Sequence, residues 1–165
     1  MSVFELAELV QRIGEIRGRK RLQKIVYLLQ QLGFPFFEEF EYGHYGPFSR
    51  SLEAEMDLLV RHGLVQEKKR GSEYMYVAGK ELKNFLSQAP VSARLKTADF
   101  AQALQLLSSL QTPVLELAST RLFLLRAGYD DDAAHVELGT RKPHLQCYLA
   151  RAKQLLANLR LAQAS

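Results

Sequence analysis

Apolar side chains recur every three or four residues in three successive segments of the first half of the chain, which is the spacing of one buried helical face. The first segment spans residues 3–16 and the second residues 18–33. The third follows Ser49 or Ser51, either of which can cap a helix, and it stops at Gly63, a residue type that favours helix ends. This pattern predicts three helices.

Strand-like segments lie between and after these helices. The aromatic segment 36–48 contains two glycines and Pro47, which favours a short strand near residues 39–43 followed by a tight turn. Residues 64–67 and 74–77 also read as strands, and the basic and small residues between them predict a hairpin with a basic tip. We expect the strand near residues 39–43 to pair against this hairpin.

Three helices followed by a two-stranded hairpin is the order of a winged helix-turn-helix, which we expect over residues 1–88. A short helix near residues 81–86 and a stretch around Pro90 form a junction. Beyond it the pattern is helical, and the last helix is expected to be unbroken over residues 145–159. The predicted fold class is mainly α (α+β): a winged helix-turn-helix with a small antiparallel hairpin or sheet, and a C-terminal helical region, 97–165, packed on it.

The composition fits an ordinary folded protein. Of 165 residues, 47% are hydrophobic and 24% charged, which supplies a core. Cys147 is the only cysteine, so no intrachain disulfide can form, and a lone thiol suits a reducing compartment. Glu116 and Arg121 interrupt the best apolar run before it reaches the roughly 18 to 20 residues of a membrane span. Because the first residues also do not resemble a signal peptide, we expect a cytoplasmic protein outside the membrane.

Positive charge gathers in two places, although the net charge is only +4. One cluster begins the second helix, where cations oppose the helix dipole and so indicate a purpose other than helix stability. The other is the hairpin tip. Both clusters fit phosphate contacts of a winged helix on duplex DNA, and both also fit an ordinary solvated surface. The residues predicted to bind nucleic acid are Arg19, Lys20, Arg21, Lys24, Arg50, Lys68, Lys69 and Arg70.

The third helix favours a different partner. It carries Glu53, Glu55 and Asp57, and acids in the major groove would repel the DNA backbone. The alternative is a protein-interaction module, antitoxin-like or an adaptor, that acts through the mixed-charge helix 49–62 and the aromatic turn 36–48. Its predicted contact residues are Tyr42, His44, Tyr45, Glu53, Asp57 and Arg61. The simpler interpretation of the aromatic turn is that it packs in the core.

No complete catalytic or metal site is visible in the sequence. His144 and Cys147 are one helical turn apart and His135 could join them, but no second ligand pair supports a metal site, and a buried thiol is the simpler account. No phosphate-binding glycine loop, nucleophile elbow or paired-cysteine motif occurs. The leading hypothesis is therefore a non-catalytic transcription regulator that binds DNA without metal or cofactor. Its last helix packs within the chain or in a homodimer.

Several motifs carry a family resemblance. They are residues 18–30, Tyr42, residues 45–49 and 63–65, and the later stretch 115–148, in which Lys142 and Pro143 precede the final helix. With these motifs the chain resembles the YwgA-like proteins, which are related to the Panacea (SocA-like) antitoxin domain. The resemblance covers most of the chain and implies a winged-helix or regulator-like protein, or an antitoxin that neutralises a partner toxin. Lys24 and Tyr27 match the family pattern, and no catalytic role is attached to them.

Overall fold

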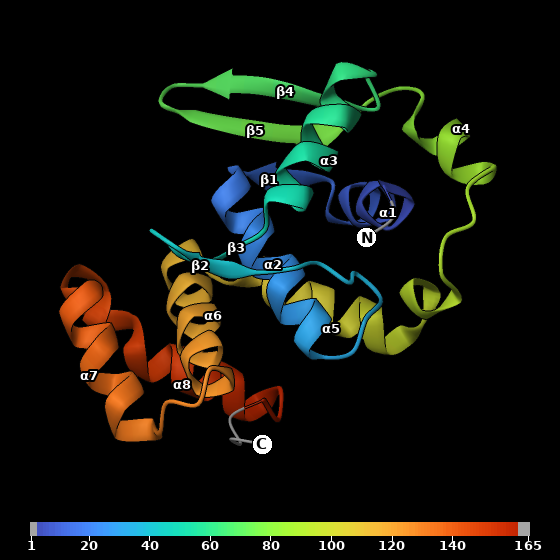
Figure 1. Ribbon diagram of the computed structural model, residues 1–165. Helices are drawn as coiled ribbons and strands as arrows, with labels where there is room; N and C mark the ends of the chain where they lie inside the picture. Colours follow the sequence, from blue (N-terminus) through green and yellow to red (C-terminus); the bar gives the residue numbers. More distant parts are fainter. Residues whose placement is uncertain (1–2, 162–165) are drawn as a thin grey trace.

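The computed structural model describes residues 3–161, which form a mostly helical α+β protein with small antiparallel sheets (Figure 1). The first half contains α1 (Val3–Ile13), β1 (Glu15–Arg17), α2 (Arg19–Gln31), β2 (Glu41–Gly43), β3 (Gly46–Phe48), α3 (Arg50–Arg61), β4 (Val65–Arg70) and β5 (Glu73–Ala78). The second half contains α4 (Leu82–Ser87), the 3-10 helix η1 (Ala93–Lys96), α5 (Ala98–Ser109), α6 (Thr112–Arg126), α7 (Asp131–Arg141), the 3-10 helix η2 (Pro143–Tyr148) and α8 (Leu149–Asn158).

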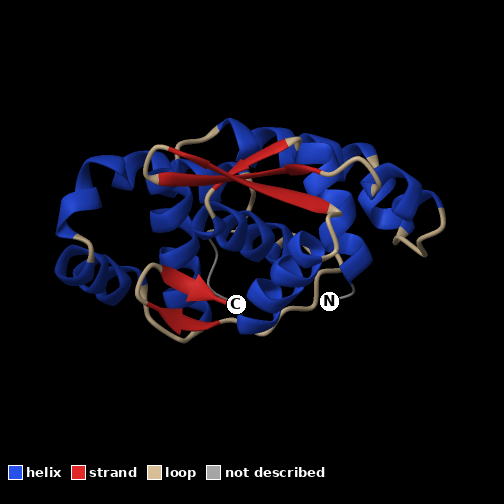
Figure 2. Ribbon diagram, turned by 90° about the horizontal axis from the view of Figure 1, so that it is seen from above, coloured by secondary structure: helices blue, strands red, loops and turns tan. Residues whose placement is uncertain are grey.

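The predicted hairpin is confirmed as β4–β5, but its third strand is a different one from the strand expected. The segment near residues 39–43 does not join the hairpin: β2 pairs with β3, with Glu41 opposite Phe48, in a separate two-stranded sheet (Figure 2). The third strand of the hairpin sheet is β1, which pairs with β5 so that Ile16 lies opposite Tyr76. Residues 39–43 pair locally because Gly43 and Gly46 flank a two-residue turn between β2 and β3. Strand β1 was not predicted because its three residues are too few to show an alternation of apolar and polar positions.

Helix α2 lies at the centre of the molecule (Figure 1). Its residues from Leu22 to Leu29 are all buried, and it contacts β1, β3, α5 and α6. Helix α6 is buried along almost its whole length and also packs against α7 and α8. The second half therefore packs on the first around one continuous core, while the expected boundary between residues 88 and 97 stays a prediction.

Side chains cap the N-termini of α3 and α7, and the cap of α3 is one of the two serines expected from the sequence. Of the two serines before α3, Ser49 is the cap, because its Oγ accepts a hydrogen bond from the Leu52 backbone N–H. Asp130 caps α7 in the same way. The last helix is not continuous: Pro143 opens η2, whose Gln146 side chain donates to the backbone oxygens of Leu138 and Lys142 and ties this segment to the end of α7. None of the helices within residues 3–161 has the length and apolar character that crossing a membrane requires.

Replacing Gly46 by alanine is expected to destabilise the protein. Gly46 has a φ of +89°, and a Cβ at this position would lie 2.2 Å from Thr120 Oγ1 on α6. Backbone strain and overpacking together predict a loss of about 2 to 4 kcal/mol in the free energy of unfolding, measured by urea denaturation. Gly128→Ala is the matched control, because Gly128 has a φ of +95° with open space around it, and strain alone should cost about 1 to 2 kcal/mol. Equal losses would contradict the close approach of β3 and α6.

Candidate nucleic-acid interface

Arg19, the first residue of α2, holds the elements of the predicted DNA-binding half together. Its Nη1 lies 2.7 Å from Glu53 Oε1 and 2.6 Å from Asp57 Oδ1, both on α3. Its Nε donates a hydrogen bond of 2.9 Å to the Tyr76 hydroxyl on β5, which in turn donates to Glu67 on β4 at 2.6 Å. One guanidinium therefore connects α2, α3 and both strands of the hairpin.

Arg19 keeps its positive charge near neutral pH. Burial lowers the pKa of Arg19, but hydrogen bonds with Tyr76, Glu53 and Asp57 outweigh burial and raise this pKa above its ordinary value. Burial and the hydrogen bond to Glu67 raise the pKa of Tyr76 to about 12. The carboxylates of Glu53 and Asp57 are thus matched to a permanent internal cation, so they oppose an approaching phosphate less than the sequence suggests.

Arg21 and Lys24 of the α2 cluster are also directed inward, whereas Lys20 is partly exposed. Arg21 donates through Nη1 to the backbone oxygen of Leu110 and through Nη2 to that of Ser108, both at 2.7 Å, at the end of α5. Lys24 is 2% exposed, and its Nζ donates to the Pro47 backbone oxygen at 2.7 Å. Lys20 is partly exposed, and its Nζ lies 3.1 Å from Glu116 Oε2 on α6. The structure does not bring these side chains onto one exposed surface.

Lys24 is a buried cation whose pKa is strongly shifted. Burial lowers the pKa of Lys24 to about 7; Glu116 raises it, whereas Lys142 and Lys20 lower it further. Burial also raises the pKa of Glu116, but the hydrogen bond and charge of Lys142, with those of Lys20, outweigh burial and hold that pKa below its ordinary value. The negative charge of Glu116 is therefore stable at neutral pH, whereas Lys24 titrates near it.

The cations of the hairpin are exposed, in contrast to those of α2. Lys68, Lys69 and Arg70 occupy the end of β4, and all three are exposed. The ammonium of Lys69 lies 5.9 Å from the centre of the Tyr74 ring, and Arg70 stands opposite Glu73 in the strand register. Figure 1 shows this hairpin projecting beyond the helices. These three side chains can reach a partner in solution.

The exposed residues of α3 include one acid, Asp57, which is paired with Arg19. Ser51, Ala54, Leu58 and Arg61 recur at three- and four-residue steps and are all exposed, so they form one stripe of the helix surface. At the start of the helix, the exposed Arg50 pairs with Glu41 at 2.8 Å.

Glu55 lies beside this outward face of α3. It is half-buried, and burial together with the nearby Glu38 and Glu5 raises its pKa to about 7, so its charge near neutral pH is reduced.

The residues predicted for protein interaction divide between two elements. Tyr42, His44 and Tyr45 belong to the β2–β3 hairpin, where Tyr42 packs on Phe123 and the exposed rings of His44 and Tyr45 meet edge to face at 4.6 Å. Glu53, Asp57 and Arg61 belong to α3, and the two acids are bound to Arg19 as described above.

Glu116 and Lys142 are the important polar residues that the sequence did not single out as a site. They form a buried ion pair, with 2.6 Å between Lys142 Nζ and Glu116 Oε1. The acid interrupting an apolar run was the available signal, because an acid inside a buried helix needs a partner.

His135, His144 and Cys147 are not placed together to hold a metal ion. Among residues 3–161, no three His, Cys, Asp or Glu side chains are placed to hold one metal ion together. Cys147 is exposed, which corrects the expected buried thiol: it lies on the solvent side of η2, whose inward residue is Leu145.

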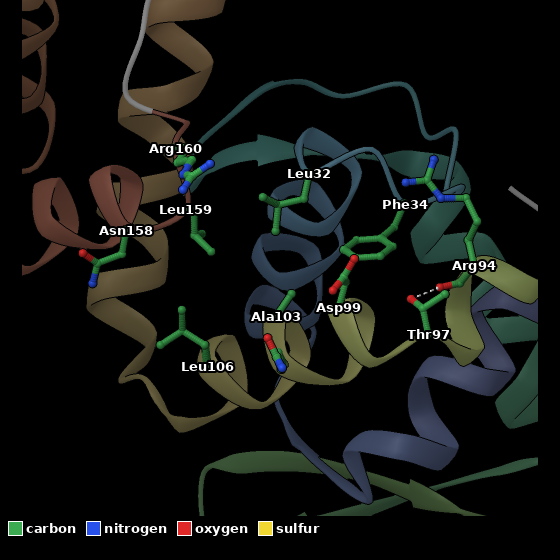
Figure 3. Close-up of a pocket in the computed structure, with 11 residues that line it drawn as sticks. Leu32, Phe34, Arg94, Thr97, Asp99, Ala103, Leu106, Asn158, Leu159 and Arg160 are labelled. Atoms are coloured by element: carbon green, nitrogen blue, oxygen red, sulfur yellow. Dashed lines mark hydrogen bonds between the residues drawn. The ribbon is translucent and has the colours of Figure 1, made fainter.

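A hollow of about 700 Å³ lies between the end of α2, α5 and the end of α8 (Figure 3). Leu32, Ala103, Leu106 and Leu159 give it apolar walls, and Arg94 lies 5.9 Å from the centre of the Phe34 ring at its edge. It shares no residue with either predicted interface.

Comparison with known proteins identifies the family. No family model matches the chain. The uncharacterized protein YwgA of Bacillus subtilis (strain 168) is 33% identical over 133 residues, which cover 78% of this chain and 76% of that protein. The chain belongs to the YwgA-like family. This membership confirms the resemblance found in the sequence, whereas the relation of the YwgA-like chain to the Panacea domain stays a prediction.

The Lys24→Met variant is expected to change how the stability of this YwgA-like protein depends on pH. Between about pH 7 and the ordinary lysine value of 10.5, the unfolded chain holds the Lys24 proton and the folded chain releases it. The unfolded state therefore binds more protons, so Lys24 makes the free energy of unfolding rise with pH in this window. Urea unfolding at about pH 6.5 and about pH 9 should show a smaller rise in the variant than in the wild-type protein.

Lys153→Met is the control for this measurement, because Lys153 is exposed on α8. It should keep the wild-type difference between the two pH values. An unchanged difference in Lys24→Met would show that Lys24 does not lose its proton in the folded state.

Proposed function

We propose that the first half of the chain is a winged helix and that the protein is a non-catalytic regulator that binds duplex DNA. The element order supports this: α1, β1, α2 and α3 are followed by the hairpin β4–β5, and β1 completes the hairpin sheet as its third strand. In this arrangement α3 is the recognition helix and β4–β5 the wing. Residues 32–49, which include the β2–β3 sheet, make the connection before α3 longer than the usual short turn.

The placement of charge around α3 and the wing carries the proposal. The acids nearest to α2, Glu53, Asp57 and Glu67, all face Arg19, while the wing cations face solvent. A phosphate approaching from outside would therefore meet acids that are already paired with Arg19, beside the exposed cations of the wing. We infer that the DNA contacts are Arg50, Arg61, Lys68, Lys69 and Arg70, without the inward-directed cations of α2.

The outward stripe of α3 also indicates how strongly the protein would discriminate between DNA sequences. Ser51, Ala54 and Leu58 offer few hydrogen bonds to base edges, although Ala54 and Leu58 can contact thymine methyl groups. Arg61 is the residue on this stripe that suits guanine. Binding should therefore depend mainly on phosphates and show a modest sequence preference.

Neutralising the wing, with Lys68→Gln, Lys69→Gln and Arg70→Gln combined, is expected to weaken binding to mixed-sequence duplex DNA. Each phosphate contact contributes about 0.9 to the slope of log affinity against log salt, so losing three should reduce the slope by about 2.7. Fluorescence anisotropy at several salt concentrations measures both effects. The melting temperature should stay close to that of the wild-type protein, because the three side chains are exposed.

The matched control removes the same charge elsewhere, with Lys83→Gln, Arg151→Gln and Lys153→Gln on the exposed faces of α4 and α8. This triple variant should keep the wild-type salt slope. No binding by the wild-type protein at low salt would contradict DNA binding, and equal losses in the two variants would contradict the role of the wing.

A second candidate function, the protein-interaction module, is favoured by one observation. The aromatic turn is only partly in the core: Phe36 is fully buried, but its neighbour Phe37 is 78% exposed and has a φ of +52°. A large apolar ring held in solvent is a common feature of protein contact sites. Such a partner would be a toxin, another regulatory protein or a second copy of this chain.

Phe37→Ser tests this second function. If the turn holds a partner, light scattering of the natively purified protein should give a mass above that of one 18.8 kDa chain, and the variant should lower it. Val136→Ser is the control, because Val136 is 66% exposed on α7. A single-chain mass for the wild-type protein, or an equal effect of both variants, would contradict a contact through Phe37.

A further inference from the structure

A second hollow, of about 540 Å³, lies between the β2–β3 hairpin and the junction of α7 with η2. Its lining includes Glu116 and Lys142, both nearly buried. Tyr42, His44, Arg141 and His144 also line it, and of these four only Tyr42 is half-buried while the others are exposed. The hollow is therefore built from both halves of the chain and is open to solvent at an edge that carries basic groups.

Three lysines gather around one carboxylate beside this hollow. Lys142 Nζ lies 2.6 Å from Glu116 Oε1, and Lys20 Nζ lies 3.1 Å from the second oxygen, Oε2. The buried Lys24 is close enough for its pKa to respond to all three of these residues. Both oxygens of the carboxylate are thus occupied by ammonium groups.

This arrangement leaves an excess of positive charge. Glu116 is the one acid among the described residues that line the hollow, and it balances only one of the two ammonium groups bound to its oxygens. A cation removed from water without a counter-charge is unfavourable, and a bound anion relieves that cost. Among the cations at the edge, Arg141 already pairs with Glu137 on its own helix. The unbalanced charge therefore belongs to the lysines.

Lys142 lines the hollow, and the ammonium of Lys20 lies beside it, against the ring of Tyr45, which is part of the lining. Lys142 donates to Glu116 and, at 3.4 Å, to the His44 backbone oxygen, which uses two of its three N–H groups. The side chain of Lys20 is 42% exposed, and its ammonium lies 4.4 Å from the centre of the Tyr45 ring. An anion in the hollow can therefore contact fixed positive groups without displacing Glu116.

We propose that this hollow binds a small phosphate-bearing molecule, held by Lys20 and Lys142 and by Arg141 and His144 at the edge. A phosphate group offers three strong acceptor oxygens, enough for Lys142, Lys20 and Arg141 together, whereas a carboxylate offers two. The volume is within the range of small-molecule sites and exceeds the needs of inorganic phosphate alone, so we assign the ligand to the organic phosphates. The site shares none of the proposed DNA contacts.

Isothermal titration calorimetry at constant ionic strength tests the site with two probes, inorganic phosphate and adenosine 5′-monophosphate. We expect saturable binding of both, because both carry the phosphate group. Lys20→Met and Arg141→Gln should each weaken binding about tenfold, the effect of one charge-assisted hydrogen bond. Lys153→Met, which removes an exposed charge on α8, should leave the affinity unchanged. No DNA enters this experiment, so its result is independent of the wing.

The two variants are chosen so that folding is preserved. Lys20→Met leaves Glu116 paired with Lys142, and Arg141 is exposed, so circular dichroism should match that of the wild-type protein. Lys142→Met would leave Glu116 with Lys20 as its remaining hydrogen-bond partner and is therefore not used. Absence of saturable binding by the wild-type protein, or binding that all variants retain equally, would overturn the proposal.

Discussion

The first turn of α2 is the point on which the remaining structure depends. Its cations oppose the helix dipole at a cost of about 0.3 to 1 kcal/mol each. A hydrogen bond to a charged group contributes about 1.5 to 3 kcal/mol, and Arg19 and Arg21 each make more than one. Even after a discount for partial exposure, the tertiary contacts outweigh the dipole. The helix therefore begins with cations because they bind α3, β4, β5 and the end of α5.

The same contacts explain why two basic clusters with similar sequences differ in how far a partner in solution can reach them. At the start of α2, acids and carbonyl groups from distant parts of the chain surround each side chain, such as Glu53 for Arg19 and the Leu110 carbonyl for Arg21. On the wing, the residues opposite Lys68 and Lys69 in the register are Met75 and Tyr74, which carry no charge. A run of basic residues indicates where positive charge is located along the chain, but tertiary structure decides whether a partner can reach it.

Most of the helices could be predicted from the sequence, because periodicity and caps such as Ser49 and Asp130 are local signals. The same is true of the wing, whose strands are six residues long. The three-residue strand β1 could not be found, because Ile16 between two charged residues gives no alternation to detect. From the sequence alone, β2 could pair with β3 or with the hairpin. Only the tertiary fold decides between these two partners.

Of the candidate sites, the wing cations could be predicted and the charged cluster at Glu116 could not. Lys20, Lys24, Glu116 and Lys142 come from two helices and the end of a third, separated by up to 122 positions, so no motif links them. The sequence does show the acid, Glu116, itself. A carboxylate buried within an apolar helix needs cations as partners. Such a residue indicates a polar contact between elements even when its partners are unknown.

This polar contact also fixes how the two halves of the chain lie against each other. Apolar packing between α2 and α6 is not directional, whereas the second oxygen of Glu116 accepts Lys20 at a definite position because Lys142 already occupies the first oxygen. Lys20 follows Arg19 directly in α2, so the contact with α6 and the contact with α3 and the wing share one helical turn. A ligand that withdrew Lys20 from Glu116 would therefore act on the turn from which Arg19 contacts α3 and the hairpin, and under the proposed DNA binding its effect on DNA affinity would pass through Arg19.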